Sequence, residues 1–321
     1  MGDIKVYRTY SSYLKDKYGE KVYKLPISLP LTCPNRDGTV GHEGCIFCGE
    51  EGGSFENLSS EISVKDQLLK NKDYIGKRYN AKKFIAYFQN FTNTYLPFDD
   101  FKLYVEDAIQ EDIVGISIST RPDSVNDQYL EYLQEISEKH NLEITVELGL
   151  QTVNYHSLEK INRGHSLGEY IDAAIKLKKY GLRNCTHLIL NLPWDDQLDV
   201  VENAKVLSAL GVEEIKLHAL YILDDTSLGD MYKKGEIELI SKEEYMERVI
   251  LFLEYLDSQV VVQRIIGRAP SENSLFVNWN ESWWKIRDTI TSTMEERDSY
   301  QGKMFDYLNG KALKNLVNKD K

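Results

Sequence analysis

Cysteine and proline are scarce in this chain, which has four cysteines and seven prolines among 321 residues. The lack of proline-rich or repeated polar tracts excludes a low-complexity or linker protein. Three of the cysteines, Cys33, Cys45 and Cys48, fall in one short segment, so a disulfide framework spread over the chain is excluded as well. What remains is an ordinary globular composition, long enough to bury one large hydrophobic core with appended ends.

Long apolar runs are also absent. No stretch approaches the roughly 20 apolar residues needed to cross a bilayer, and the first residues lack the charged-then-apolar pattern of a signal peptide. We therefore expect a cytoplasmic protein with no membrane partner, in a compartment where thiols stay reduced. The sequence does not indicate an oligomeric state.

Positive charge is in short supply. The chain has 39 Lys and Arg against 51 Asp and Glu, a net charge of −12. This balance argues against a general affinity for nucleic acid, because phosphate binding depends on Lys and Arg. Basic residues nevertheless gather in residues 70–83, KNKDYIGKRYNAKK. This stretch is either a solvated helix face or a local patch that faces RNA.

Short apolar segments alternate with longer amphipathic ones along most of the chain, which is the pattern of repeated strand–helix units. Such units form a parallel sheet covered by helices, and six of them are fewer than the eight of a closed barrel. The predicted fold class is therefore α/β, a partial (β/α)6 barrel. The predicted strands are 22–29, 83–89, 112–119, 143–149, 184–190 and 213–221. The predicted helices are 61–79, 100–110, 126–139, 166–180 and 197–210.

The pattern changes after the sixth predicted strand. Residues 241–257 predict an amphipathic helix that begins at a capping box, 260–266 predict one more strand, and the Trp-rich end predicts a helical lid. We thus expect a C-terminal α/β extension on the barrel. The expected organisation is an N-terminal extension at 1–20, the barrel at 21–225 with an iron–sulfur loop at 33–48, and the extension at 226–321.

The three clustered cysteines are spaced C-x11-C-x2-C directly after the first strand. Thiolates bind soft metals, so a loop with three of them in a reducing compartment predicts a metal site. A structural zinc would need a fourth ligand, for which His42 is the nearest candidate. A four-iron cluster with one open iron needs only three thiolates. From the cysteines alone, both metals stay open.

The motifs further along the chain resemble one superfamily. The cysteine loop, ISTRPD (118–123), VELGLQT (146–152), INRGHS (161–166), HLILNLPWDD (187–196) and KLHALY (216–221) together resemble the radical S-adenosylmethionine (SAM) enzymes. The resemblance is greatest to the Elongator-catalytic-subunit-like group and its YhcC/YtqA-like bacterial branch. Two features depart from the superfamily pattern: the first cysteine spacing is wider than C-x3-C-x2-C, and FQNFTNTY (88–95) replaces the usual Gly-Gly-Glu segment.

The resemblance implies two cofactors, a [4Fe-4S] cluster on Cys33, Cys45 and Cys48, and SAM. It implies that SAM is cleaved to a 5′-deoxyadenosyl radical, which removes a hydrogen atom from the substrate. It also implies that six residues hold SAM: Phe47 against the adenine, Arg163 against the carboxylate, and Gln89, Ser119, Glu147 and Gln151 around the rest. For Glu147 the alternative is an ion pair inside the barrel with Arg121 or Arg183.

The substrate side is expected on the fifth and sixth strands. His187, His218 and Tyr221 are the candidate catalytic residues, although single histidines on strands are often hydrogen-bonded core residues. Cys185 opens the fifth strand and is expected to be a buried small hydrophobe.

The resemblance implies a tRNA-modifying enzyme, in which tRNA is the substrate and a flavodoxin or ferredoxin is the electron donor. The concrete version removes the carboxymethyl group from 5-carboxymethylaminomethyluridine at the wobble position. Two alternatives stay open: a radical SAM enzyme that acts on a small metabolite, and a zinc-stapled binding protein without catalysis.

Overall fold

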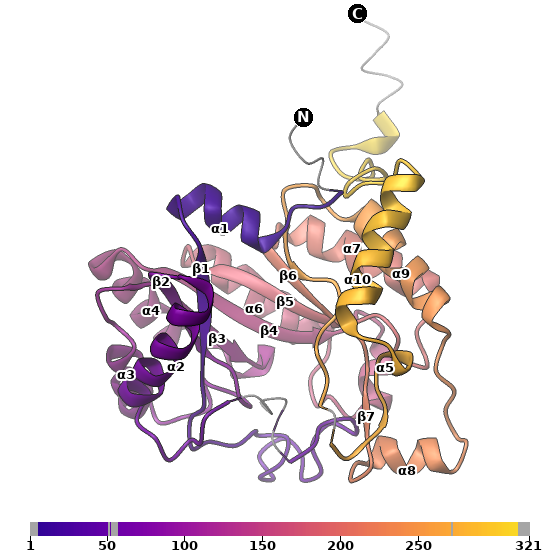
Figure 1. The fold of residues 1–321 in the computed structure, drawn as a ribbon. Coiled ribbons are helices and arrows are strands. Elements are labelled where there is room, and N and C mark those ends of the chain that lie inside the picture. Colours follow the sequence, from indigo (N-terminus) through magenta and orange to yellow (C-terminus); the bar gives the residue numbers. More distant parts are fainter. Residues whose placement is uncertain (1–5, 51, 53–56, 271, 314–321) are drawn as a thin grey trace, which may run out of the picture.

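One parallel sheet of seven strands organises the chain, in the order β1-β2-β3-β4-β5-β6-β8 (Figure 1). The computed structural model describes residues 6–50, 52, 57–270 and 272–313. The first residues of the expected N-terminal extension and the last of the C-terminal extension lie outside the described residues. The strands of the sheet are β1 (Val22–Ile27), β2 (Lys83–Phe88), β3 (Ile113–Thr120), β4 (Glu143–Gln151), β5 (Arg183–Ile189), β6 (Glu214–His218) and β8 (Val261–Arg264).

Helices alternate with these strands and cover the outer face of the curved sheet (Figure 1). The helices that join or follow strands of the sheet are α2 (Val64–Tyr79), α3 (Phe98–Asp107), α4 (Asp127–His140), α6 (Leu167–Lys179), α7 (Gln197–Leu210) and α9 (Lys242–Tyr255). The remaining helices are α1 (Tyr10–Tyr18), α5 (Tyr155–Lys160), α8 (Ser227–Lys233) and α10 (Trp283–Glu296). A separate antiparallel pair joins β7 (Ile222–Leu223) to β9 (Ser274–Phe276).

This architecture confirms the predicted α/β fold, a parallel sheet curled into part of a barrel. All six predicted strands form, and the strand predicted at 260–266 is β8, which pairs in parallel with β6. That strand was expected in the C-terminal extension but is the seventh strand of the same sheet. The extension's helix α9 begins at Ser241, whose side chain accepts from the Glu244 N–H at 3.1 Å.

The sheet has two edges, β1 and β8, and the segment before β1 lies between them. Thr9 forms an isolated parallel bridge with Val262 of β8, and α1 then leads across to β1 (Figure 1). The sequence pattern did not predict α1, because only Leu14 of this short polar helix is buried. The N-terminal extension is therefore part of the barrel wall at the end where the strands begin.

The side chains of β4 point alternately into the hydrophobic core and into the lumen of the curled sheet. Ile144, Val146 and Leu148 are buried in the hydrophobic core under the helices. Glu147 and Gly149, on the opposite face, line an internal cavity. Successive side chains of a strand point to opposite faces, so one strand supplies both the apolar core and the polar lumen.

Among the helices that the structure describes, none is both long enough and apolar enough to cross a bilayer.

Candidate active site

A cavity of about 1320 Å³ occupies the lumen of the curled sheet. This volume exceeds the roughly 300–1,000 Å³ of a pocket for one drug-sized ligand. Every residue predicted as a metal ligand, cofactor contact or catalytic group lines this one cavity: Cys33, Cys45, Phe47, Cys48, Gln89, Ser119, Glu147, Gln151, Arg163, His187, His218 and Tyr221. Residues that span the sequence from 33 to 221 are thus brought to one place.

The cysteine loop leaves β1 at the edge of the sheet where the strands end. Short turns shape it: the Cys48 N–H donates to the Cys45 carbonyl at 2.9 Å, and the Arg36 N–H donates to the Cys33 carbonyl at 2.8 Å. Side-chain amides tie the loop to the INRGHS segment, because Asn35 donates to the Asn162 carbonyl and Asn162 donates to the Gly44 carbonyl, both at 2.7 Å. The loop therefore has a fixed position relative to β4.

Arginine side chains surround the three thiols. Arg163 Nη1 lies 3.4 Å from Cys45 Sγ, while its Nε and Nη2 donate to the Gly149 carbonyl at 3.1 and 2.7 Å. Arg36 donates to the carbonyls of Cys48 and Gly49. Arg121 is buried, forms an ion pair with Asp123, and donates to the Arg163 carbonyl at 2.8 Å. Positive charge at this position stabilises thiolates.

The donor set fits a cluster held by three thiolates. Burial and the neighbouring Cys45 raise the pKa of the Cys48 thiol to about 11, with Arg36 opposing them. A metal that replaces these protons relieves that penalty, since only the thiolate is a ligand. The zinc alternative needs His42, but its ring packs over Gly38 on the exposed side of the loop. His42 is not among the residues that line the cavity with the cysteines.

Three of the residues expected to hold SAM lie at the carboxyl ends of neighbouring strands. Gln89 follows β2, Ser119 is near the end of β3, and Gln151 ends β4. The Ser119 hydroxyl donates to the Tyr87 hydroxyl at 3.1 Å. Gln151 has a left-handed backbone (φ 78°) next to an irregularity in the β4–β5 pairing. Such a conformation at a strand end is typical of a functional site.

Gly149 has no space for a side chain. A Cβ there would lie 2.6 Å from Arg163 Nη2 and 3.0 Å from Gln151 Nε2. The glycine of VELGLQT therefore lets Arg163 reach across the strand end to Cys45. His165 also approaches this strand end, with Nε2 3.2 Å from the Gly149 carbonyl. Burial, with Arg163 nearby, lowers the pKa of His165 to about 3, so this ring is neutral.

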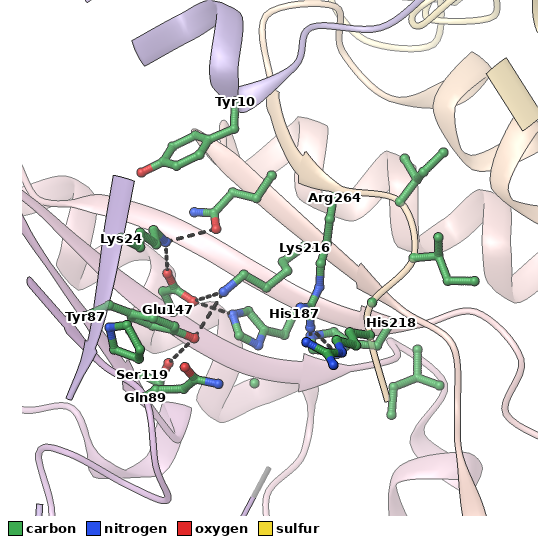
Figure 2. A pocket seen from close by; sticks show the side chains of 18 of the residues that line it. Tyr10, Lys24, Tyr87, Gln89, Ser119, Glu147, His187, Lys216, His218 and Arg264 are labelled. Carbon is green, nitrogen blue, oxygen red and sulfur yellow. Dashed lines mark hydrogen bonds and ion pairs between the residues drawn. The ribbon is translucent and has the colours of Figure 1, made fainter. Parts of the chain in front are cut away.

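Glu147 is the centre of a buried ionic network below the strand ends (Figure 2). Its carboxylate accepts from Lys24 of β1, from Lys216 of β6 at 2.5 Å, and from His187 of β5 at 2.7 Å. Burial by itself would raise the pKa of Glu147, but the two lysines and His187 hold it well below its usual range. The predicted alternative of an ion pair inside the barrel is present, with different partners.

The partners named for Glu147 from sequence pair elsewhere. Arg121 pairs with Asp123, and Arg183 pairs with Glu214 at 2.8 Å. The network also excludes a second metal site. The ligand atoms of Glu147, Cys185 and His187 lie within 4.8 Å of one another. Two ammonium groups already contact that carboxylate, and they would repel a metal cation at this position.

The two histidines of the neighbouring strands β5 and β6 lie side by side on the lumen face of the sheet, with ring centroids 5.1 Å apart (Figure 2). Burial and Lys216 lower the pKa of His187 to about 4. Burial and Arg264 lower the pKa of His218 well below its usual range. Both rings are therefore neutral near pH 7. Tyr221 lines the same cavity just beyond β6, and Cys185 is fully buried on β5.

Four lumen residues were not singled out from sequence: Lys24, Tyr87, Lys216 and Arg264. The signal that was available is a charged residue inside an otherwise apolar strand, as in VYKLPI and EIKLH. A charged side chain at such a position is equally compatible with a strand face that is exposed to solvent. The sequence does not show that both faces of these strands are covered, so the lumen position could not be predicted.

The basic stretch at 70–83 lies away from the cysteine loop. It forms the end of α2 and the start of β2, at the edge of the sheet where the strands begin. Several of its charges are paired: Lys72 with Asp112, Lys77 with Asp73, and Lys83 with Glu20. Because α2 runs opposite to the strands that it covers, the stretch lies at the other end of the barrel from the cysteine loop. This position and the paired charges favour the solvated helix face over a patch that faces RNA.

Comparison with known proteins gives a consistent result. Residues 33–207 match the radical SAM superfamily, and residues 212–296 match the radical SAM C-terminal domain. YtqA of Bacillus subtilis (strain 168) is 38% identical over 307 residues, which are 95% of this chain and 94% of YtqA. A tRNA uridine(34) acetyltransferase of Methanocaldococcus jannaschii is 27% identical over 175 residues, which are 52% of this chain and 30% of that protein.

A solved structure shares the fold. The archaeal Methanocaldococcus infernus Elp3 with an N-terminal deletion superposes with a TM-score of 0.67 at 18% identity. The match covers 87% of this chain and 64% of that chain, so this protein corresponds to under two thirds of the Elp3 structure. The chain therefore belongs to the radical SAM superfamily, in the Elongator-catalytic-subunit-like group and its YhcC/YtqA-like branch, whose members bind a [4Fe-4S] cluster and SAM.

Proposed function

We propose that this radical SAM enzyme removes the carboxymethyl group from 5-carboxymethylaminomethyluridine in tRNA. The observation that carries the catalytic part is the single cavity lined by the three cysteines, the strand-end residues and the polar lumen. The tRNA part is supported by the similarity to a tRNA uridine(34) acetyltransferase over half of the chain.

The proposed ligands of the cluster are Cys33, Cys45 and Cys48. The guanidinium groups of Arg36, Arg121 and Arg163 offset the negative charge of the thiolates. When bound, the cluster and SAM supply a 5′-deoxyadenosyl radical that abstracts a hydrogen atom. The curled sheet surrounds the lumen and excludes side reactions of so reactive a species.

Phe47, Gln89, Ser119, Gln151 and Arg163 are the proposed SAM contacts, because all five line the cavity beside the cysteines. Gln89, Ser119 and Gln151 do so from the strand ends, Phe47 from the cysteine loop, and Arg163 from the segment after α5. We assign Glu147 a different task from the ribose contact that the resemblance implies. Its carboxylate is engaged by Lys24, Lys216 and His187, so it positions these three side chains. His187, His218 and Tyr221 then line the substrate side.

The proposed reaction is an oxidation followed by hydrolysis. The methylene beside the substrate carboxylate would lose a hydrogen atom to the 5′-deoxyadenosyl radical. It would then lose one electron, which replaces the electron first given to SAM by the cluster, and the N–H proton, which leaves an imine. The substrate thus loses two electrons overall, and the coproducts would be methionine and 5′-deoxyadenosine. Water then hydrolyses the imine to 5-aminomethyluridine and glyoxylate.

The test uses the reconstituted enzyme under anaerobic reducing conditions with tRNA that carries 5-carboxymethylaminomethyluridine. We expect 5-aminomethyluridine, glyoxylate and 5′-deoxyadenosine in equal amounts, measured by mass spectrometry. Cys45→Ala is the matched control and should form none of them. If SAM is cleaved while the nucleoside stays unchanged, the enzyme acts on another substrate and the small-metabolite alternative takes over. S-adenosylhomocysteine as the only SAM product would contradict radical chemistry altogether.

A further inference from the structure

The cavity is strongly cationic, although the chain is acidic as a whole. Its described lining contains ten Lys and Arg residues but only two carboxylates, Asp16 and Glu147, while the chain carries a net charge of −12. Arg36, Arg121 and Arg163 belong to the cysteine loop and its surroundings. A second group of cations lies deeper in the lumen, where the strand-end residues no longer reach. These are Lys24, Lys216 and Arg264 (Figure 2).

Arg264 has no counterion among the described residues. Its Nη2 contacts only the ring of His218, at 2.7 and 3.2 Å from the two ring nitrogens. Its Nε is buried without a hydrogen-bond partner. Arg264 is half-buried and lines the cavity, so its guanidinium has lost part of its hydration without gaining an anion, and the buried Nε without an acceptor adds to that cost. An anionic ligand in the cavity would supply the missing partner.

Lys216 lies beside Arg264, because the two residues are register partners on the neighbouring strands β6 and β8. Its ammonium contacts Glu147 at 2.5 Å and the Tyr87 hydroxyl at 3.1 Å. Glu147 is shared with Lys24, so one carboxylate serves two ammonium groups. With both histidines neutral, Lys24, Lys216, Arg264 and Glu147 together carry two uncompensated positive charges.

We propose that Arg264 and Lys216 bind a carboxylate of the substrate inside the barrel, next to SAM. This inference rests on the proposed function and deepens it, since it names the part of the substrate that the lumen recognises. The guanidinium presents parallel N–H donors that match the two oxygens of a carboxylate. Lys216 adds a point charge from the neighbouring strand.

Binding of the substrate carboxylate at this site also positions the carbon that reacts. In 5-carboxymethylaminomethyluridine the reacting methylene is bonded directly to the carboxylate carbon. A carboxylate fixed on Arg264 and Lys216 therefore restricts the methylene to a small region of the lumen, which favours abstraction of the correct hydrogen atom. The product amine lacks the carboxylate and loses this contact, so the site discriminates substrate from product. A phosphate of the RNA chain lies several bonds from the reacting carbon, so binding a phosphate at this site would not fix the position of the methylene.

The experiment compares two RNA stem-loops, one with 5-carboxymethylaminomethyluridine and one with the uncharged amide of the same side chain. Binding to the SAM-loaded, unreduced enzyme is measured for the wild type, Arg264→Gln and Arg264→Lys. Arg297→Gln is the matched control, because Arg297 is an exposed residue that pairs with Glu247 of α9 and does not line the cavity. We expect the wild type and the control to prefer the carboxylate roughly ten- to hundred-fold, the range of a charged hydrogen bond.

In Arg264→Gln this preference should fall to near unity, and Arg264→Lys should restore part of it. SAM affinity of Arg264→Gln is measured in parallel. An unchanged carboxylate preference in this variant would overturn the proposal. So would a loss of SAM affinity larger than the loss of preference, because Arg264 would then serve the carboxylate of SAM.

A smaller probe separates this inference from the proposed function. N-methylglycine and its amide carry the same amine and carboxylate without RNA, and their binding to the SAM-loaded enzyme can be followed by ligand-detected NMR. Saturable binding of N-methylglycine that is lost in Arg264→Gln supports the carboxylate site, even if the enzyme leaves tRNA unmodified. If the wild-type enzyme converts the tRNA nucleoside but shows no saturable binding of N-methylglycine, the carboxylate site is contradicted. The proposed function is not contradicted by that result.

Discussion

Arg163 Nη1 lies 3.4 Å from the sulfur of Cys45, although 118 residues separate the two in the chain. The same guanidinium donates twice to the Gly149 carbonyl. One side chain thereby links the cysteine loop, the INRGHS segment and the end of β4. These are three of the motifs by which the sequence resembles the radical SAM superfamily, and the link explains why they occur together.

Gly149→Ala tests this link. The new Cβ would lie 2.6 Å from Arg163 Nη2, so the guanidinium must move away from Cys45. We expect SAM affinity to fall roughly ten-fold or more, on the order of one lost charged hydrogen bond, with a less stable cluster. Gly168→Ala is the control, because a Cβ there meets only Ser166 Oγ at 3.4 Å, at the start of α6. Equal SAM affinities for the two variants would contradict the assigned role of Arg163.

Replacement of single cysteines tests the cluster ligands. Cys33→Ala, Cys45→Ala and Cys48→Ala should each lose the cluster, because a three-thiolate site has no spare ligand. Cys185→Ala should retain it, since that thiol is fully buried within β5, beside Glu147. Iron and sulfide content with the visible absorption spectrum measure the outcome. Full loss of iron in Cys185→Ala, or retained iron in one of the other three, would show that the ligand set is wrong.

Glu147→Gln should destabilise the fold strongly. The carboxylate is fully buried and compensates Lys24 and Lys216, so its loss leaves the buried ammonium group of Lys216 and the half-buried one of Lys24 without an anion. Breaking one partner of a buried ion pair costs roughly 3–5 kcal/mol in the free energy of unfolding. The double variant Glu147→Gln, Lys216→Met should recover part of this loss. Urea denaturation measures both, and a double variant less stable than the single one would contradict the charge-balance argument.

The lowered pKa of His187 makes the free energy of unfolding depend on pH. Its pKa in the folded protein is about 4, because burial and Lys216 disfavour the charged ring, whereas an unfolded histidine titrates near 6.5. Between these values the unfolded state binds more protons, so stability falls as the pH decreases from about 6.5 to about 4. His187→Gln should flatten this part of the stability profile. Parallel profiles for the wild type and the variant in thermal unfolding would show that His187 does not titrate as described.

The sequence by itself determined the succession of strands and helices along the chain, because hydrophobic periodicity and helix caps are local features. Gly211, for example, caps α7 in a left-handed conformation (φ 68°), at the position expected from the pattern. The sequence also determined the cysteine loop and the strand-end motifs. Those residues occur in short segments whose spacing is visible without any knowledge of the fold.

Only the tertiary structure decided which charges meet inside the barrel. Lys24, Glu147, Lys216 and Arg264 come from four strands separated by long helices, and no local pattern specifies that they share one lumen. The predicted partners of Glu147 were wrong for the same reason. Periodicity tells whether a side chain is on one face of a strand or the other. Which residues it meets there depends on strand order and register, and these arise from packing of the whole sheet.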